Sequence, residues 1–441
     1  MTILRVKGAT VHKEAEALNL QLKGTVGERL LSPLGRRAYY PISGIPGQTG
    51  EARGTRVNAT LGQAFDDERR PLVLACLAEQ AKLPIGEVFP YPPTHGIGQL
   101  RELWQKEIQR KNPSLEGRIS LPVATAGLAS GLTLARELFI GEGDEVTLYR
   151  PYWGNYLLHF QGDNGLTEIT ELSLYKGEGL DLESLEESLR GSGKKHSLCL
   201  TFPSNPTGYT PTISEADQLV TILKDAADRD NAICVITDDA YNGLVYEKGL
   251  LTESLFGRLA HAHPNILAVK VDGPTKECFF WGGRVGFLTY GFQGMTQEAA
   301  NALEDKTAGR VRGTISGVTT QSQYMVLHGL QDPHFQEQVE DRRNVLKARA
   351  QAIKATLAQH PEWEEEFVAL PFNSGYFMCT QLKRADPEKV RRVLREQHNI
   401  GVLSLNDPIY GGLIRVALSA VPQRDISEVY DRLYQASKGS H

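Results

Sequence analysis

Long apolar runs are absent from this sequence. No stretch approaches the roughly 18 consecutive apolar residues that a membrane-spanning helix requires. The N-terminal residues also lack the continuous apolar segment and the small-residue cleavage site of a secretory signal peptide. Charge of one sign is not concentrated anywhere either, since 48 basic and 53 acidic residues are intermixed and leave a net charge of −5. We therefore expect a cytoplasmic protein that binds neither a membrane nor nucleic acid.

Cysteine is also scarce: the 441-residue chain has five, an odd number, and most of them lie within apolar segments. This arrangement predicts reduced thiols in a hydrophobic core, and neither a disulfide framework nor a metal site. What the sequence does have is length and apolar content, with 41% hydrophobic residues. A chain of this size can bury a large core, and its length predicts two or three domains.

Strands and helices alternate from residue 121 to residue 290. Apolar segments such as 232–237 and 266–271 have the length and branching of buried strands, and helical patterns lie between them. The alternation predicts a mostly parallel sheet with helices on both faces, in which ligands bind at the carboxyl ends of the strands. Apolar spacing also predicts a helix over 71–82. Residues 1–56 are weakly periodic and glycine-rich, which predicts an irregular arm that packs on the body or on a second subunit.

Lys276 lies in a tight connection between two apolar segments, 266–271 and 285–290, after Gly273-Pro274 has broken the first. Such a lysine is either a solvated loop residue or an amine that the protein uses. Arg284, bracketed by glycines eight residues later, bears on that choice, because a partly buried amine near a second cation loses its proton more readily. A neutral lysine is what Schiff-base chemistry needs, and the planar fork of an arginine suits a phosphate. The pair suggests a lysine that carries pyridoxal 5′-phosphate (PLP).

Together, Lys276 and Arg284 resemble the cofactor-lysine segment of fold type I PLP enzymes, and in particular of the class I and II aminotransferases. The motifs are most similar to those of the aspartate aminotransferase group, and the similarity extends from about Val57 to Val421. The resemblance implies an α/β fold in which a large domain, with a mostly parallel sheet flanked by helices, is joined to a smaller α+β domain. The implied divisions are an N-terminal arm (1–56), a lid segment of the small domain (57–70), a large PLP-binding domain (71–335) and a C-terminal small domain (336–441).

The phosphate of the cofactor needs an anion site. Residues 123–131 predict a strand, a turn of small residues and the start of a helix, where free backbone N–H groups and the helix dipole favour an anion. An ordinary strand–helix junction is the alternative. The residues that the resemblance assigns to the phosphate are Gly127, Leu128, Ala129, Arg284, Thr275 and, from the second subunit of a dimer, Tyr91. Tyr91 lies in a proline-rich loop, where simple packing is the alternative, and Gly273 stands where the family commonly has a serine.

The strand predicted at 232–237 ends in two acidic residues, Asp238 and Asp239. A carboxylate is costly to bury there unless it is paired, and the pyridinium nitrogen of PLP would pair it. At about 4 Å and an effective dielectric constant near 20, such a pair contributes on the order of 4 kcal/mol. The resemblance assigns Asp238 to the ring nitrogen and Tyr241, three residues later, to the 3′ oxygen of the cofactor. Asp239 is the competing candidate, and the spacing to the tyrosine favours Asp238.

Two more motifs bear on the cofactor ring. Asn205 opens an Asn-Pro-Thr-Gly turn after a buried strand, and by resemblance it donates to the 3′ oxygen and lies beside the substrate. Trp153 follows Pro151 and Tyr152, and by resemblance its ring covers the face of the pyridine. Such a stack adds roughly 0.5–1.5 kcal/mol beyond the area it buries. Tyr152 is the competing aromatic residue.

Arg415 interrupts the apolar segment 412–419, and a buried arginine needs an anion. The resemblance supplies one in the alpha-carboxylate of an amino acid, held by two hydrogen bonds; a structural salt bridge is the alternative. Gly62 resembles a glycine that lines the substrate pocket, although it could be a simple turn residue. Arg312 resembles an arginine that the partner subunit lends to the distal carboxylate of the substrate. The match is partial, because the family differs from this chain at 316–319, and a surface arginine is the alternative.

By this resemblance the chain is a PLP-dependent aminotransferase that moves an amino group from an L-amino acid, with aspartate or glutamate favoured, to a 2-oxo acid. The implied catalytic residues are Lys276, which forms a Schiff base, Asp238 and Tyr241. The implied assembly is a homodimer with shared active sites, and no metal is expected. An aromatic amino acid aminotransferase, or a PLP-dependent lyase or decarboxylase, is the alternative, because the bond that breaks depends on pocket geometry.

Overall fold

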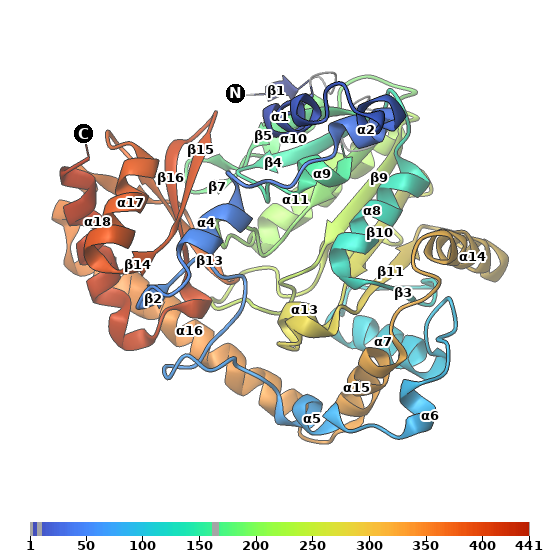
Figure 1. The fold of residues 1–441 in the computed structure, drawn as a ribbon. Helices are drawn as coiled ribbons and strands as arrows, with labels where there is room; N and C mark the ends of the chain where they lie inside the picture. The colour runs from blue at the N-terminus through green and yellow to red at the C-terminus, as the bar shows by residue number, and fades with distance from the viewer. Residues whose placement is uncertain (1–2, 7–10, 161–166, 441) are drawn as a thin grey trace.

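A computed structural model describes residues 3–6, 11–160 and 167–440 (Figure 1). Residues 1–2 and 7–10 of the predicted arm, 161–166 of the predicted large domain and 441 lie outside the described residues. The described chain contains a large body built on an eight-stranded sheet and a smaller one built on a four-stranded sheet. Figure 1 shows the smaller body, in orange and red, beside the larger one.

The eight-stranded sheet has the order β1-β5-β4-β8-β9-β10-β11-β3. Neighbouring strands from β5 to β10 run parallel, whereas β1 pairs antiparallel with β5 and β11 pairs antiparallel with β10 and β3. The predicted mostly parallel sheet is therefore confirmed. Its strands are β1 (Ile3–Val6), β3 (Val123–Thr125), β4 (Glu145–Arg150), β5 (Glu168–Ser173), β8 (Lys195–Leu200), β9 (Ala232–Asp238), β10 (Ile266–Asp272) and β11 (Gly286–Gly291).

Helices flank this sheet, and α8 packs on β3, β9, β10 and β11. The helices of this body are α5 (Ala75–Ala78), α6 (Ile85–Val88), α7 (Gly98–Lys111), α8 (Gly127–Phe139), α9 (Tyr156–Phe160), α10 (Leu182–Ser188), α11 (Ile213–Asp228), α12 (Leu255–Leu259), α13 (Pro274–Glu277), α14 (Gln297–Thr314) and α15 (Thr320–Gln331), and a small hairpin joins β6 (Tyr175–Lys176) to β7 (Gly179–Leu180). Among the helices described, none combines the length and the apolar character needed to cross a bilayer.

The smaller body has an antiparallel sheet in the order β12-β13-β16-β15. The long helix α16 (Phe335–Gln359) leads into it from the larger body, as the orange helix in Figure 1 shows. A short parallel pair, β2 with β14, ties residues 57–58 to the same body. Its elements are β12 (Phe367–Ala369), β13 (Phe377–Leu382), α17 (Pro387–His398), β14 (Ile400–Gly401), β15 (Leu403–Asp407), β16 (Gly411–Ala417) and α18 (Ile426–Lys438), with β2 at Val57–Asn58.

Two local predictions were wrong. The N-terminal residues are not irregular, because they contain β1 and the helices α1 (Lys13–Gln21), α2 (Val26–Leu30), α3 (Pro33–Arg37) and α4 (Ile45–Glu51). Most of these helices are too short to show a helical period. The helix predicted over 71–82 is reduced to α5 and a 3₁₀ turn at Glu79–Ala81. Its first residues are extended instead, because Pro71 bridges to Phe65 and the Leu72 N–H donates to the Ala64 carbonyl.

Candidate active site

A cavity of about 370 Å³ lies at the carboxyl ends of β9 and β10. It receives side chains from both bodies and from α4 of the N-terminal arm. The sequence-predicted residues that line it are Gly62, Leu128, Ala129, Trp153, Asn205, Asp238, Tyr241, Thr275, Lys276, Arg284 and Arg415. The parallel strands bring the residues of the larger body together because their carboxyl ends meet at one edge of the sheet, and the smaller body adds Arg415 from β16.

Lys276 sits on α13, the single helical turn between β10 and β11. Its Nζ atom lies 4.9 Å from the centroid of the Tyr241 ring. Burial lowers the pKa of Lys276 to about 8, Asp238 opposes that change and Arg284 adds to it. The direction agrees with the prediction for an amine beside a second cation. At neutral pH a usable fraction of such an amine is deprotonated, which an ordinary lysine with a pKa near 10.4 does not offer.

Asp238 is the last residue of β9 and is buried. Its Oδ2 accepts a 2.6 Å hydrogen bond from the Tyr156 hydroxyl, and its Oδ1 accepts one of 3.2 Å from the Ala240 N–H. Burial raises the pKa of Asp238, while the Tyr156 hydrogen bond and the Lys276 charge oppose the rise. Asp239, the competing candidate, does not line the cavity and pairs with Lys270. The structure therefore leaves Asp238 as the carboxylate that faces Lys276.

The start of α8 and Arg284 form a cationic corner of this cavity. The capping residue Ala126 supplies no side-chain acceptor, so the first N–H groups of the helix stay available. Gly127 has a φ of +78°, and a Cβ at this position would lie 2.5 Å from Nη2 of Arg284. Nearby, the buried Oγ1 of Thr275 has no hydrogen-bond partner among the described residues. Arg284 donates to the Trp281 carbonyl and has no ion pair within the described ranges. Helix dipole, guanidinium and orphaned hydroxyl together suit a phosphate.

Arg415 lies on β16, and its side chain is buried. Its Nη2 donates to the Thr60 carbonyl at 2.8 Å and its Nη1 to Oδ1 of Asn205 at 3.3 Å, while its Nε finds no acceptor in the part of the chain that the structure describes. The guanidinium carbon lies 4.0 Å from the centroid of the Phe377 ring. Burial lowers the pKa of Arg415 to about 10, so the group is still charged at neutral pH. No acidic residue among those described pairs with it, so the salt bridge considered as the alternative is not formed.

Three other predicted residues complete the walls. Nδ2 of Asn205 lies 3.5 Å from the Tyr241 hydroxyl, which links the Arg415 side of the cavity to the tyrosine. Trp153 lines the cavity, packed edge-on against Tyr156 at a centroid distance of 5.7 Å. The competing aromatic, Tyr152, does not line it and donates instead to Oε1 of Glu171 at 2.6 Å. The choice of Trp153 over Tyr152 agrees with this arrangement.

Tyr91 and Arg312 are not brought into the cavity of their own chain. The Tyr91 side chain is 96% exposed, and Arg312 lies exposed in the last turn of α14. Their segments nevertheless contact one another, because Oγ1 of Thr94 donates to the Ser316 carbonyl at 3.3 Å. Both residues are therefore exposed outside the cavity, on two segments that touch one another.

The sequence reasoning missed several residues of the cavity wall. Tyr156 is the most informative, because its hydroxyl binds Asp238 and its pKa is raised by burial. It lies three residues after Trp153, a spacing that could have indicated it. Ile45 and Thr49 of α4 also line the cavity, together with Thr60. No signal in the sequence pointed to the two arm residues, since they lie in a segment without clear periodicity.

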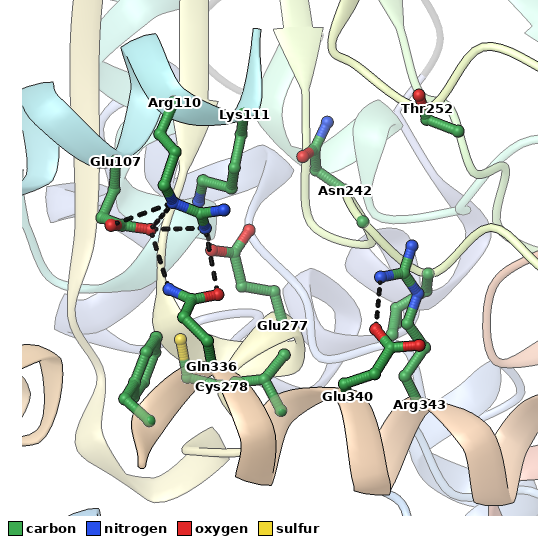
Figure 2. Close-up of a pocket in the computed structure, with 14 residues that line it drawn as sticks. Glu107, Arg110, Lys111, Asn242, Thr252, Glu277, Cys278, Gln336, Glu340 and Arg343 are labelled. Carbon is green, nitrogen blue, oxygen red and sulfur yellow. Dashed lines mark hydrogen bonds and ion pairs between the residues drawn. The ribbon is translucent and has the colours of Figure 1, made fainter. Parts of the chain in front are cut away.

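A second cavity, of about 220 Å³, lies between α7, α13, α16 and the loop after Tyr241. Figure 2 shows its charged walls, where Arg110 contacts Glu107 and Arg343 contacts Glu340. At its side, Nζ of Lys111 lies 2.5 Å from Oε1 of Glu277, the residue that follows Lys276. None of the predicted cofactor or substrate residues lines this second cavity.

The residues of the first cavity fit PLP. An amine with a lowered pKa suits the aldehyde, a carboxylate at a strand end suits the ring nitrogen, and a helix start with a nearby guanidinium suits the phosphate. The orphaned Thr275 hydroxyl offers a further donor to an anion. Each part of the cofactor thus has a chemically matched group in one cavity.

Comparisons with known proteins agree with this geometry. The family model described as aminotransferase class I and II matches residues 60–433. Among curated relatives, the chain is 27% identical over 271 residues to a probable aspartate/prephenate aminotransferase of Aquifex aeolicus and 24% identical over 273 residues to an aspartate aminotransferase of Bacillus sp. strain YM-2. Each of these matches spans 62% of this chain and 64% of the relative's length.

Solved structures share the fold. An aminotransferase from Anaerococcus prevotii superposes with a TM-score of 0.76 at 23% identity, over 89% of this chain and 95% of that one. The aspartate aminotransferase of Thermus thermophilus with maleate superposes with a TM-score of 0.71 at 18% identity, over 92% and 99% of the two chains. The chain therefore belongs to the class I and II aminotransferases, a family that uses pyridoxal 5′-phosphate.

Proposed function

We propose that this protein is a PLP-dependent aminotransferase that transfers the amino group of an L-amino acid to a 2-oxo acid. The observation that carries the proposal is one amine that shares a cavity with two arginines. Lys276 shares its cavity with Arg284 and Arg415, and neither arginine has an acidic partner in the described part of the chain. Arg415 is buried, where a charge needs an anion, and suits a substrate carboxylate. Arg284 is exposed at the same cavity, acts on the lysine whose pKa is lowered, and suits a cofactor phosphate.

The residues of the cavity divide the work of holding the cofactor. Lys276 would hold its aldehyde carbon, and the backbone of Gly127 to Ala129, with Arg284 and Thr275, would hold its phosphate. Asp238 would face the ring nitrogen, and Tyr241 with Asn205 the 3′ oxygen. Trp153 would cover one face of the ring. When bound, PLP supplies an electron-withdrawing protonated ring that makes the alpha hydrogen of an amino acid acidic.

The chain's own groups then perform the proton transfer. Arg415 would bind the alpha-carboxylate through two parallel hydrogen bonds and so fix the alpha carbon near Lys276. Once the amino group of the substrate has taken its place on the aldehyde carbon, the released Nζ of Lys276, neutral in a usable fraction at physiological pH, would take the alpha proton as a general base. Asp238, held by the Tyr156 hydroxyl, would keep a negative charge opposite the ring nitrogen. The small-domain residues Arg415 and Phe377 would help to exclude water.

Arg415→Ala is expected to lower kcat/KM for every amino acid donor by about 100-fold, chiefly through KM. The loss corresponds to about 3 kcal/mol, the value of two hydrogen bonds to a charged group. Cofactor affinity should stay within about threefold of the unchanged protein, because Arg415 faces the substrate side. Steady-state kinetics with the exposed-site variant Arg432→Ala as the matched control checks this. Equal losses of cofactor and of substrate affinity would rule out the assigned role.

A donor panel tests the reaction class itself. An aminotransferase converts its bound cofactor to the amine form when an amino acid is added, and a 2-oxo acid reverses the change. Neither ammonia nor carbon dioxide is released in that exchange. Release of either product in proportion to amino acid consumed would instead assign a lyase or a decarboxylase to the same site.

Aspartate or glutamate is the donor that we favour, with aromatic amino acids second. The relatives named as aspartate aminotransferases support this choice, as does Arg312, an exposed cation without an ion pair among the described residues. If Arg312 binds the distal carboxylate, Arg312→Ala should reduce aspartate turnover about tenfold relative to phenylalanine. The matched control is Arg310→Ala, on the same helix and already paired with Glu137. An unchanged ratio of the two turnover numbers would remove Arg312 from the substrate site.

The proposed assembly is a homodimer in which each chain lends Tyr91 and Arg312 to the other. Exposed apolar residues near Tyr91, such as Ile85, Phe89 and Ile315, support an interface on this face, since apolar groups of this size are usually covered. Co-expressing Lys276→Ala with Arg312→Ala should restore normal aspartate turnover in roughly a quarter of all sites, because a mixed dimer has one site with both residues. Either variant expressed alone should lack normal aspartate turnover. If co-expression does not restore it, Lys276 and Arg312 of the same chain act in the same site.

A further inference from the structure

Lys270 is an ammonium inside the main sheet. It lies on β10 between two valines, and its side chain is almost fully buried. Val271, the next residue, faces α8, because a Cβ on Gly131 of that helix would lie 2.9 Å from the valine side chain. Side chains alternate along a strand, so Lys270 and Asp272 face the opposite side of the sheet. A charge in such a place is costly unless it is paired.

The partners of Lys270 are two carboxylates on that same side. Its Nζ lies 2.5 Å from Oδ2 of Asp239 and 3.6 Å from Oδ2 of Asp272. Asp239 also accepts hydrogen bonds from the hydroxyls of Ser254, at 2.6 Å, and Thr237, at 3.1 Å. Asp272 accepts a 3.0 Å bond from the Trp104 indole and has a pKa raised to about 6 by burial, against the opposing charge of Lys270. Lys270 therefore forms ion pairs with two buried carboxylates, Asp239 and Asp272.

The sheet separates the two adjacent acids at the end of β9. Asp238 is in register with Val271 and shares its side, which is the side of α8 and of the candidate active site. The Asp239 side chain lies on the same side of the sheet as Lys270. Among the described residues, Lys270 is the cation with which Asp239 forms an ion pair. The negative charge of Asp239 nevertheless acts on Asp238, and it raises the pKa of that neighbour in addition to the larger effect of burial. The state of Asp238 thus depends on what neutralises Asp239.

We propose that Lys270 is a positioning residue for the reaction: by holding and neutralising Asp239 behind the sheet, it leaves Asp238 as the anion in the cavity. This inference rests on the proposed function, because it concerns the carboxylate that would face the ring nitrogen of PLP. Without Lys270, Asp239 is a buried anion one residue away, and Asp238 becomes easier to protonate. A protonated Asp238 no longer favours a protonated cofactor ring.

The groups that face the two carboxylates come from several elements. Lys270 and Asp272 on β10 face Asp239. Asp238 interacts, through a hydrogen bond or through its charge, with five titratable or charged groups. They are Tyr156 of α9, Cys199 of β8, Lys276 of α13, Tyr241 and Asp239. Two cations occur among these groups, Lys270 and Lys276. Lys270 lies outside the lining of the candidate cavity, so it can be changed without removing a group that would touch the cofactor.

The test measures PLP binding across a pH series, by cofactor absorbance and equilibrium dialysis. In Lys270→Met, the pH below which the cofactor is lost should rise by about one unit, and affinity at pH values below the midpoint of the unchanged protein should fall about tenfold. In the double variant Lys270→Met with Asp239→Asn, which removes both charges of the pair, the midpoint should return to that of the unchanged protein. Asp239→Asn alone should move the midpoint downward. If Lys270→Met does not fold, the other two variants still decide the matter.

Lys111→Met is the matched control, since it removes another largely shielded ammonium, one that is paired with Glu277 and acts on Asp272. It should lower the melting temperature without moving the pH midpoint. Equal shifts in Lys111→Met and Lys270→Met, or no shift in Lys270→Met and Asp239→Asn, would reduce Lys270 to a folding role. If the unchanged protein takes up no PLP at all, the proposed function fails first and this inference with it.

Discussion

Lys276→Ala is expected to abolish amino-group transfer, with a loss of about 10⁴-fold or more. The variant removes the amine that would both hold the cofactor and accept the alpha proton. Lys276 is suited to these tasks because it stands on α13 at the carboxyl end of β10, with its pKa lowered to about 8. No other lysine lines the cavity among the described residues, so no neighbour can take over. Steady-state turnover and the absorbance of bound cofactor measure the two tasks separately.

The control for this variant is Lys248→Ala, which removes an exposed lysine distant from the cavity lining. It should retain both activity and cofactor absorbance. Lys276→Ala should still fold, because the change removes a group that costs free energy to bury and leaves the α13 backbone contacts in place. Turnover by Lys276→Ala within about tenfold of the unchanged protein would contradict the assignment of the base.

Asp238→Asn is expected to lower kcat by about 10³-fold. A carboxylate about 4 Å from the ring nitrogen contributes on the order of 4 kcal/mol at an effective dielectric constant near 20, which corresponds to about three orders of magnitude in rate. Asparagine keeps the size of the side chain and its hydrogen bond with Tyr156, but it carries no charge. The effect therefore isolates the electrostatic contribution of Asp238. Single-turnover measurements with one amino acid donor report it directly.

Tyr156→Phe is the comparison variant for Asp238→Asn, because it removes a hydrogen bond to the carboxylate and not its charge. It removes the 2.6 Å hydrogen bond to Oδ2 but leaves the carboxylate charged, so a loss of only about tenfold is expected. A large loss for the tyrosine variant together with a small loss for Asp238→Asn would show that hydrogen-bond geometry, and not charge, matters at this position. The acid limb of the pH profile should also move upward in Tyr156→Phe, since that hydrogen bond opposes the rise in the pKa of Asp238.

The parts of the fold that could be predicted are those that local chemistry specifies. Strands such as β9 and β10 are buried on both faces and appear in the sequence as continuous apolar segments. Because ligands gather where such strands end, the sequence pattern predicted that Asp238 and Lys276 lie at this edge of the sheet, and both line the cavity there. Arg415 was recognisable for a similar reason, as a charge inside an apolar segment.

The remaining features depend on contacts between distant parts of the chain. Residues 71–74 are extended because of their pairing near Phe65, which outweighs their helical spacing. Ile45 reaches the cavity only because the arm folds back over it. The pairing of Lys270 with Asp239 has no local sign in the sequence, because the register of β9 on β10 brings the two residues together. Tyr91 and Arg312 would act in the site of a second subunit, so one chain cannot assign them.

Covalent trapping of the cofactor tests the central claim most directly. The protein is incubated with PLP, reduced with borohydride and digested, and the modified peptide is sequenced by mass spectrometry. The account predicts a single phosphopyridoxyl group, attached to Lys276, which disappears in Lys276→Ala and persists in Lys248→Ala. A protein that takes up no cofactor, or a label attached to a different lysine, would contradict it.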